Sequence, residues 1–271
     1  MADHADTPRP PVALAAAAHP DDIEFMFAGT LLRLKAAGCE IHMWNLANGS
    51  CGTTQYGKDE IIRLRRAEAE ASAALAGAVY HPPLCDDLAV FYTPELVARA
   101  AAVIRDIQPT LMLVPSPQDY MEDHTNACRI LVTAAFVRGM PNFACDPPTP
   151  PWDGHTVLYH GLPHGLRDGL RRLVRSGQYV DIAPALELKR EMLAQHRTQK
   201  DWLDSSQGIG AYVSEMEAMC RKVGEMSGRF AIAEGWRRHS HLGFADAAAD
   251  PLSKLLGGAC WTDEGYEKEL G

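Results

Sequence analysis

Short apolar runs alternate with longer amphipathic segments along most of the chain. The continuous apolar runs have the length and the pattern of strands that are buried on both faces of a sheet. Strands are predicted at 12–18, 39–47, around Val79, 110–114, 156–159 and 179–182. Helices are predicted at 28–37, 60–75, 94–107, 126–138, 184–202 and, from a weaker pattern, 209–223. Each of the first four strands is therefore followed by a helix.

This alternation predicts βαβ units and an α/β fold with a mostly parallel sheet. We expect a Rossmann-like, three-layer αβα sandwich. The pattern breaks at 139–152, a loop that ends in a proline-rich stretch. Since no repeat and no clear linker divides the chain, residues 1–271 are expected to form one domain. Within it, 1–11 is expected to be a disordered arm and about 140–271 a decorated C-terminal part.

Composition narrows the class of protein. With 46% hydrophobic and 23% charged residues, the chain resembles soluble globular proteins. A formal net charge of -9 opposes nucleic acid as a partner, because nucleic-acid-binding surfaces are basic. No apolar run approaches the roughly 18 residues of a membrane span, and the polar N-terminus lacks the features of a signal peptide.

The seven cysteines are scattered and include no CxxC pair. This pattern opposes both a disulfide framework and a cysteine-based zinc site. Free thiols in a reducing compartment are the simpler interpretation, so we expect a cytoplasmic protein with no membrane partner.

Polar side chains follow three of the predicted strands. His19, Asp21 and Asp22 come after the first strand, a loop at 48–54 follows the second, and 115–124 follows the fourth. Ligands bind outside the carboxyl ends of strands in open α/β sheets, and these ends share one edge. Two imidazoles and one carboxylate suit catalytic zinc, and a second carboxylate beside them suits a general base.

Simpler interpretations remain open from the residues alone. The aspartates of the HPDD turn are good caps for the following helix, and His124 is also compatible with an ordinary residue of a first helical turn. A nucleotide-binding domain is a further alternative. It is opposed by the lack of a G-x-G-x-x-G after the first strand and by two carboxylates in the place of a phosphate loop.

Several stretches resemble the LmbE-like or PIG-L-like zinc-dependent N-deacetylases. The similar stretches are AAHPDDIEFMFAGTLLRLKAAG, LANGSCGT, RRAEAEASAALAGA, PQDYMEDHTNACRI, YVDIAPALELKREMLAQHRTQ and FAIAEGWRR. Together they extend from about Val12 to Arg238. In the fifth stretch, Thr198 stands where relatives carry serine.

The resemblance implies a role for each matching position. His19, Asp22 and His124 match the zinc ligands, with ferrous iron as an alternative metal, and Asp21 matches the general base. Substrate-contacting positions are matched by Arg65 and by Asn48 and Gly49 in the loop after the second strand. Asp123 matches an acidic residue that pairs with a histidine.

One position departs from the pattern of the relatives. Met121 stands where many relatives carry a histidine that helps to protonate the leaving amine or to hold the oxyanion. His164 and His160 are candidates for this duty, Asp123 is a further candidate, and Tyr120 is a weaker one. Asp21 acting alone, or a weaker or different activity, are the other outcomes left open.

The expected function is that of a metal-dependent amide hydrolase. It would remove an acyl group from a small N-acetylated, sugar-like substrate with the help of Zn²⁺ (or Fe²⁺). The alternatives are an amidase for a sugar–thiol conjugate and a degenerate relative that binds metal or ligand without turnover. The resemblance also implies a homo-oligomer, a trimer or a hexamer. Specificity is expected from the irregular loops at 50–57, 143–152 and 161–169.

Overall fold

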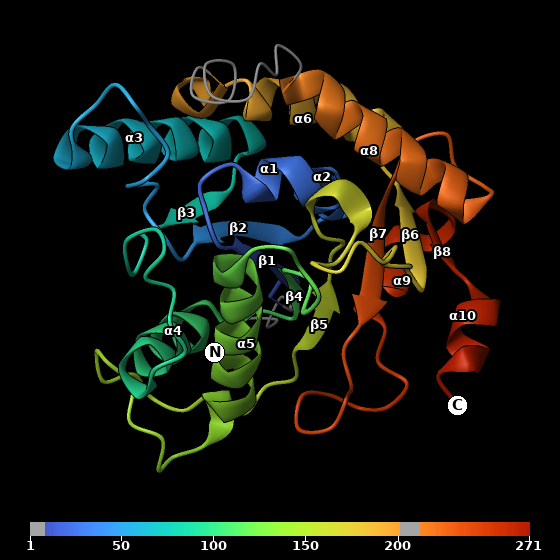
Figure 1. The fold of residues 1–271 in the computed structure, drawn as a ribbon. Coiled ribbons are helices and arrows are strands. Elements are labelled where there is room, and N and C mark those ends of the chain that lie inside the picture. Colours follow the sequence, from blue (N-terminus) through green and yellow to red (C-terminus); the bar gives the residue numbers. More distant parts are fainter. Residues whose placement is uncertain (1–8, 201–211) are drawn as a thin grey trace, which may run out of the picture.

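The computed structural model describes residues 9–200 and 212–271 (Figure 1). Within them, the strands form one sheet in the order β3-β2-β1-β4-β5-β7-β6-β8. They are β1 (Val12–Ala17), β2 (Glu40–Asn45), β3 (Val79–His81), β4 (Leu111–Val114), β5 (Val157–His160), β6 (Gln178–Asp181), β7 (Ala233–Arg238) and β8 (Cys260–Thr262). The pairings from β3 to β5 are parallel, whereas β7, β6 and β8 extend the sheet in antiparallel pairings. The prediction of an α/β fold with a mostly parallel sheet is confirmed.

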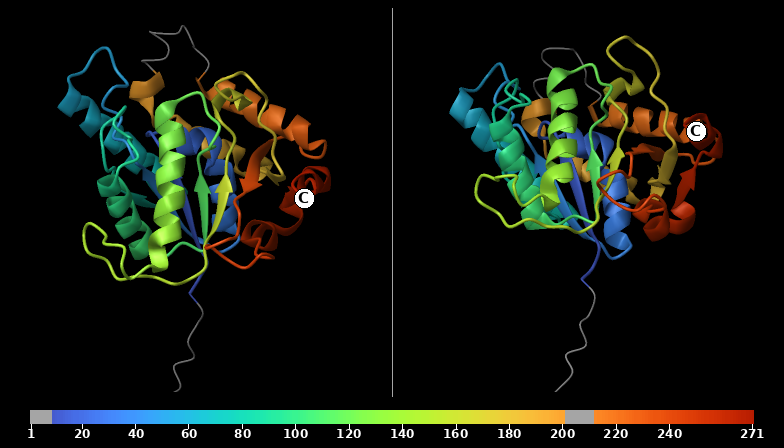
Figure 2. Two further views of the ribbon diagram at one scale, coloured as in Figure 1. Left: turned by 60° about the horizontal axis from the view of Figure 1, so that its bottom comes forward. Right: turned by 90° about the horizontal axis from the view of Figure 1, so that it is seen from below.

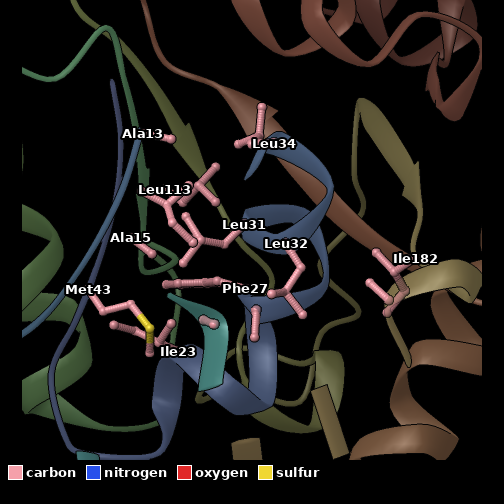
Figure 3. Packing of buried hydrophobic residues seen from close by; sticks show 14 of the residues in the cluster. Ala13, Ala15, Ile23, Phe27, Leu31, Leu32, Leu34, Met43, Leu113 and Ile182 are labelled. Atoms are coloured by element: carbon pink, nitrogen blue, oxygen red, sulfur yellow. The ribbon is translucent and has the colours of Figure 1, made fainter. Parts of the chain in front are cut away.

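The central strand β1 contributes to two separate cores. Ala13, Ala15 and Ala17 belong to one hydrophobic cluster, whereas Leu14 and Ala16 belong to another. Since successive side chains of a strand point to opposite faces, the alternation places one cluster on each side of the sheet. Figure 3 shows the first of these clusters, in which helical side chains pack on the small alanines of β1.

Helices cover both faces of the sheet and complete a three-layer sandwich. One layer contains α1 (Asp22–Met26), α2 (Ala28–Ala36), α3 (Lys58–Ala76), α6 (Leu186–Leu193), α8 (Tyr212–Ser227) and α9 (Pro251–Leu256). The other contains α4 (Pro94–Ile107) and α5 (Glu122–Phe136), which lie in front of the sheet in Figure 2. The last helix, α10 (Glu264–Glu269), follows β8 at the edge of the sheet.

The start of α4 illustrates how local sequence determines an element. Thr93 precedes the helix, and its hydroxyl accepts a hydrogen bond from the amide of Leu96 at 3.2 Å. Pro94 occupies the first helical position. Proline is tolerated there because a backbone N–H at this position would have no acceptor within the helix. The predicted helix 94–107 is confirmed with both of its ends.

Other boundaries differ from the prediction. α5 begins at Glu122, four residues before the predicted start at 126, so His124 lies in its first turn. The helix predicted at 184–202 is interrupted after α6 at Leu193, and residues 197–200 are helical again. Its last two residues, and residues 209–211 of the next predicted helix, lie outside the described part of the chain, as do residues 1–8 of the expected arm.

A buried ion pair connects the C-terminal part of the chain with α2. The ammonium group of Lys189, in α6, donates to the carboxylate of Glu234, in β7. That carboxylate also accepts from the amides of Gly29 and Thr30 at 2.8 and 2.7 Å, at the start of α2. Lys189 also donates to the carbonyl of Phe25 at 3.0 Å. Because all of these residues are buried, the contacts satisfy polar groups that water does not reach. No helix in the described residues is both long enough and apolar enough to cross a membrane.

Candidate active site

A tight turn after β1 directs two neighbouring carboxylates to different places. The amide of His19 donates to Oδ2 of Asp22 at 2.7 Å, and the amide of Asp22 donates back to the carbonyl of His19 at 3.2 Å. Between them, Asp21 has a φ of 106°, a left-handed conformation that residues with a side chain rarely adopt. As a result, Asp22 faces the two histidines while Asp21 faces Arg65 and Tyr212.

His19, Asp22 and His124 form a group able to hold a metal ion. One ligand atom of each lies within 4.8 Å of the other two. Nδ1 of His19 is 3.6 Å from Oδ2 of Asp22, and Nε2 of His124 is 3.5 Å from Oδ1 of the same residue. The arrangement leaves room for an ion between three groups of the kinds that zinc prefers.

The second nitrogen of each imidazole faces another carboxylate. Nε2 of His19 is 2.9 Å from Oδ2 of Asp123, and Nδ1 of His124 is 3.1 Å from Oδ1 of Asp119. Such partners fix the tautomer and the orientation of metal-binding histidines. His19, in the turn after β1, and His124, in the first turn of α5, therefore each have a carboxylate beside their second nitrogen.

The charges of this group depend strongly on one another. Burial lowers the pKa of His19, but hydrogen bonds to Asp123 and Asp22 outweigh this effect and raise the pKa to about 10. The pKa of His124 is also raised, because the charges of Asp22 and Asp119 outweigh its burial. For Asp22, burial raises the pKa, and the two histidines lower it to a net value well below the usual range. The cluster thus favours positive charge beside Asp22, which a divalent metal ion also supplies.

Asp21 has a different environment from its neighbour. Burial raises the pKa of its carboxyl, an effect that the charge of Arg65, 3.7 Å away, and the hydrogen bond from the Tyr212 hydroxyl only partly offset. A carboxylate with a raised pKa accepts protons more readily than a free one. Because Asp21 belongs to no metal-binding group among the described residues and lines the cavity, it is placed to exchange protons there.

Arg65 borders the cavity but is only 2% exposed. Its guanidinium donates to the carbonyl of Pro20 at 2.5 Å and lies beside Asp21. A Cβ atom on Gly49 would lie 2.5 Å from Cδ of this arginine, so the loop after β2 closes directly over it. The same glycine has a φ of 79°, which a larger residue would adopt only with strain.

Asn48 and Gly49 fix the neighbouring turn at Asp86 and Asp87. The side-chain amide of Asn48 donates to Asp86 at 2.6 Å, and the amide of Gly49 donates to Asp87 at 2.7 Å. Neither Asn48 nor Gly49 is among the residues that line the cavity, whereas Asp87 is. In this structure the two residues support the wall of the site from behind.

A cavity of about 530 Å³ lies in front of the metal-binding group. Its wall is formed by His19, Asp21, Asp22, Phe25, Met26, Cys51, Gly52, Arg65, Asp87, Leu88, Tyr120, Met121, His124, His164, Gln199, Tyr212 and Glu215. A second cavity of about 240 Å³, beside Leu158, His239 and Tyr266, contains none of the metal-binding side chains. The volume of the first is that of a small-molecule site.

The two candidate proton donors occupy different places. His164 borders the cavity, where its ring lies 4.8 Å from that of Phe25 and its Nε2 is 3.4 Å from Glu215. His160 is buried away from the cavity, with its nitrogens 3.0 Å from the carbonyl of Pro115 and 2.9 Å from Nδ1 of His239. Burial lowers the pKa of His160 to about 4. Asp123 is already engaged by His19 and by the amide of Leu88.

Sequence reasoning missed several polar residues of the site. Among them are Asp87, Asp119, Tyr212 and Glu215. A carboxylate in the loop just before His124 was a local signal for Asp119. For Tyr212, by contrast, no local pattern exists, because it contacts Asp21 from a helix 191 positions away in the chain.

Part of the chain matches the model of a known protein family. Residues 14–136 match the family described as PIG-L, GlcNAc-PI de-N-acetylase. These residues include the HPDD turn, Arg65 and His124. The resemblance of its motifs to this family is thereby confirmed.

Individual members and solved structures are also similar. Over 189 residues, 67% of each chain, the sequence is 29% identical to the diacetylchitobiose deacetylase of Thermococcus kodakarensis. The structure resembles that of N,N'-diacetylchitobiose deacetylase from Pyrococcus horikoshii, with a TM-score of 0.70 and 23% identity over 89% of this chain and 88% of the other.

A solved structure with another activity has the same fold. GalB, the 4-carboxy-2-hydroxymuconate hydratase of Pseudomonas putida, gives a TM-score of 0.68 and 21% identity over 89% of this chain and 99% of the other. The fold alone therefore does not decide the reaction, which has to be argued from the site.

Proposed function

We propose that this chain is a metal-dependent N-deacetylase that hydrolyses the amide bond of a small N-acetylated sugar. The observation that carries the proposal is the separation of roles at the HPDD turn. Asp22 faces His19 and His124, whereas the adjacent Asp21 lies free of that group at the cavity wall. The relative from Thermococcus kodakarensis, which is named a diacetylchitobiose deacetylase, supports this choice of substrate.

The three ligating residues fit a zinc ion, with ferrous iron as an alternative. Two imidazoles and a carboxylate are a common set for catalytic zinc, and each imidazole has a carboxylate beside its second nitrogen, as metal-binding histidines commonly do. When bound there, zinc would supply a Lewis acid that polarises the amide carbonyl and lowers the pKa of a water molecule.

Asp21 is the general base in this proposal. Its carboxylate takes the proton from the water that attacks the amide carbon. The hydroxyl of Tyr212 and the guanidinium of Arg65 hold that carboxylate in place, and they do so from elements that are far apart in the chain. Since burial raises its pKa, Asp21 is also able to pass the proton on.

His164 delivers a proton to the leaving amine. Met121 has no proton to give, and His164 is the candidate histidine that lines the cavity. Glu215, 3.4 Å from Nε2, orients its ring at the cavity wall. His160 is left out of the reaction, because its two nitrogens are engaged in the buried contacts to Pro115 and His239.

Two alternatives concern the same site. The first is an amidase for a sugar–thiol conjugate, whose amide is the same reacting group. The second is a protein that binds metal or ligand without turnover, which would have the same metal ligands. A panel of substrates separates them: N-acetylglucosamine, diacetylchitobiose and an N-acyl sugar–thiol conjugate are incubated with zinc-loaded protein, and free amine is measured with and without a chelator.

Each result of this panel has a defined meaning. We expect amine release from at least one of the acetylated sugars and its loss with the chelator. Release from the thiol conjugate alone would favour the amidase, and no release from any substrate by protein that holds zinc would contradict the proposed function.

We further propose that the chain acts as one domain, since one sheet joins its N- and C-terminal parts. A location in the cytoplasm stays a prediction from the scattered cysteines. Assembly into a trimer or a hexamer stays a prediction from the family resemblance, and sedimentation of the purified protein tests it.

A further inference from the structure

Leu88 lies at the rim of the cavity in a conformation that is rare for a leucine. Its φ is 59°, in the left-handed region where a side chain crowds the backbone. The residue is also 59% exposed, although most large apolar residues of the chain are buried. A strained and exposed apolar residue beside a reaction centre calls for a functional reason.

Hydrogen bonds of the metal site hold Leu88 in this position. Its amide donates to Oδ2 of Asp123 at 2.7 Å, and the same oxygen lies 2.9 Å from Nε2 of His19. The preceding residue, Asp87, accepts from the amides of Gly49 and Cys51 at 2.7 and 2.9 Å. The leucine is therefore fixed between the loop after β2 and the start of α5.

Other apolar side chains continue from Leu88 along the cavity wall. Met26, Phe25, Tyr120 and Met121 also line the cavity, and Tyr120 is 58% exposed. Met121 increases the apolar surface at a position where the family resemblance places a histidine.

Ring contacts connect this surface with the metal-binding group. The ring of His164 lies 4.8 Å from that of Phe25 and 6.2 Å from that of Tyr120, which in turn lies 5.8 Å from His124. An apolar and aromatic surface thus extends from the solvent-exposed rim to a metal ligand.

A plain N-acetylated sugar does not use this surface fully. Its hydroxyl groups prefer water or polar partners, and Leu88 and Tyr120 would stay exposed to solvent. An apolar group on the substrate would cover both side chains. Binding of the substrate would become more favourable with each carbon that this group removes from water.

We propose that the substrate is an N-acyl amino sugar with an apolar group of several carbons, which covers Leu88 and Tyr120. The group is either an aglycone on the sugar or a longer acyl chain on the amine, since both provide the same chemistry next to the amide. This inference rests on the proposed function and specifies its substrate class.

The test compares three substrates with zinc-loaded protein: N-acetylglucosamine, its hexyl glycoside, and N-octanoylglucosamine. We expect kcat/KM for at least one of the two apolar substrates to exceed that for N-acetylglucosamine by about tenfold or more. The two apolar substrates distinguish an aglycone from an acyl chain as the source of the apolar group.

Two variants show whether Leu88 is responsible. L88N removes the apolar side chain, and asparagine tolerates the left-handed backbone, so folding is preserved. It should reduce the advantage of the apolar substrate to less than about threefold. L242N, which changes a 69% exposed leucine that does not line the cavity, should keep the advantage. Equal kcat/KM for all three substrates, or an advantage that survives L88N, would overturn the inference.

A binding measurement separates this inference from the proposed function. If none of the substrates releases amine, the proposed function fails, and calorimetry then compares hexyl glucosaminide with glucosamine as ligands of the zinc-loaded protein. Tighter binding of the hexyl compound by about tenfold, lost in L88N, would support the apolar site. Equal binding of the two compounds, or no binding, would overturn it.

Discussion

Nε2 of His19 lies 2.9 Å from Oδ2 of Asp123, a residue 104 positions later in the chain. This contact connects the end of β1 with the first turn of α5 and leaves Nδ1 of His19 facing Asp22. His124 repeats the arrangement with Asp119. Each imidazole therefore has one nitrogen held by a carboxylate and one directed to the metal-binding position.

The carboxylate of Asp123 should strengthen metal binding through His19. D123N replaces the charge with a neutral amide, which orients the imidazole less firmly. We expect the affinity for zinc to fall about 10–100-fold, as measured by competition with a chromophoric chelator. E122Q, a change of the exposed neighbouring residue, should bind zinc like the unchanged protein. An unaltered affinity of D123N would show that the contact does not support the metal.

Zinc binding should release protons and should strengthen as the pH rises. In the metal-free protein the pKa of His19 is raised to about 10, so this ring holds a proton at neutral pH that zinc must displace. The proton stabilises the metal-free fold fully below the ordinary pKa of 6.5, and this contribution is lost as the pH rises through about 10. Calorimetry at pH 7.5 in buffers of different ionisation enthalpy measures the release. An enthalpy that does not depend on the buffer would contradict the prediction.

His164, and not the position of Met121, should supply the proton for the leaving amine. H164Q is expected to lower kcat for amine release about 10²-fold or more, whereas M121H should change it by less than about threefold. H155Q alters an exposed histidine that is not among the residues lining the cavity and serves as the control. A large increase of kcat in M121H, with little effect of H164Q, would show that the proton donor is missing from this chain.

The buried pair of Lys189 and Glu234 should be important for stability. K189M leaves the Glu234 carboxylate buried with only the amides of Gly29 and Thr30. We expect the free energy of unfolding, from urea denaturation, to fall by about 3–5 kcal/mol. K222M breaks the exposed contact of Lys222 with Glu225 and should cost less than about 1 kcal/mol. Similar small losses in both variants would mean that the buried pair contributes little.

The sequence predicted those parts of the fold whose signals are local. The alanine run of β1 and the cap of α4 at Thr93 each lie within a few residues of the element that they determine. The predicted strands from β1 to β6 are all present, with ends shifted by a few residues. By contrast, β7 was missed because it contains Glu234 and two arginines and resembles an exposed segment. The Glu234 carboxylate is buried because Lys189 from α6 and two amides at the start of α2 compensate it there.

The site followed the same division between local and distant signals. The positions of His19, Asp21 and Asp22 relative to one another follow from one turn. The meeting with His124 followed from the rule that parallel strands end at one edge of a sheet. The contact between Tyr212 and Asp21 depends on how α8 packs over α1, which no local pattern encodes. Nor did the loop sequence reveal that Asn48 and Gly49 support the wall from behind.

The central claim is that two adjacent aspartates have separate duties, and the paired variants D21N and D22N test it most directly. Both replace a carboxylate with an amide of the same size, and the zinc content and the rate of amine release are measured for each. D21N should retain about one zinc per chain and lose about 10²–10⁴-fold in kcat, whereas D22N should lose the zinc itself. Turnover near the unchanged rate in D21N, or full zinc content in D22N, would contradict the account.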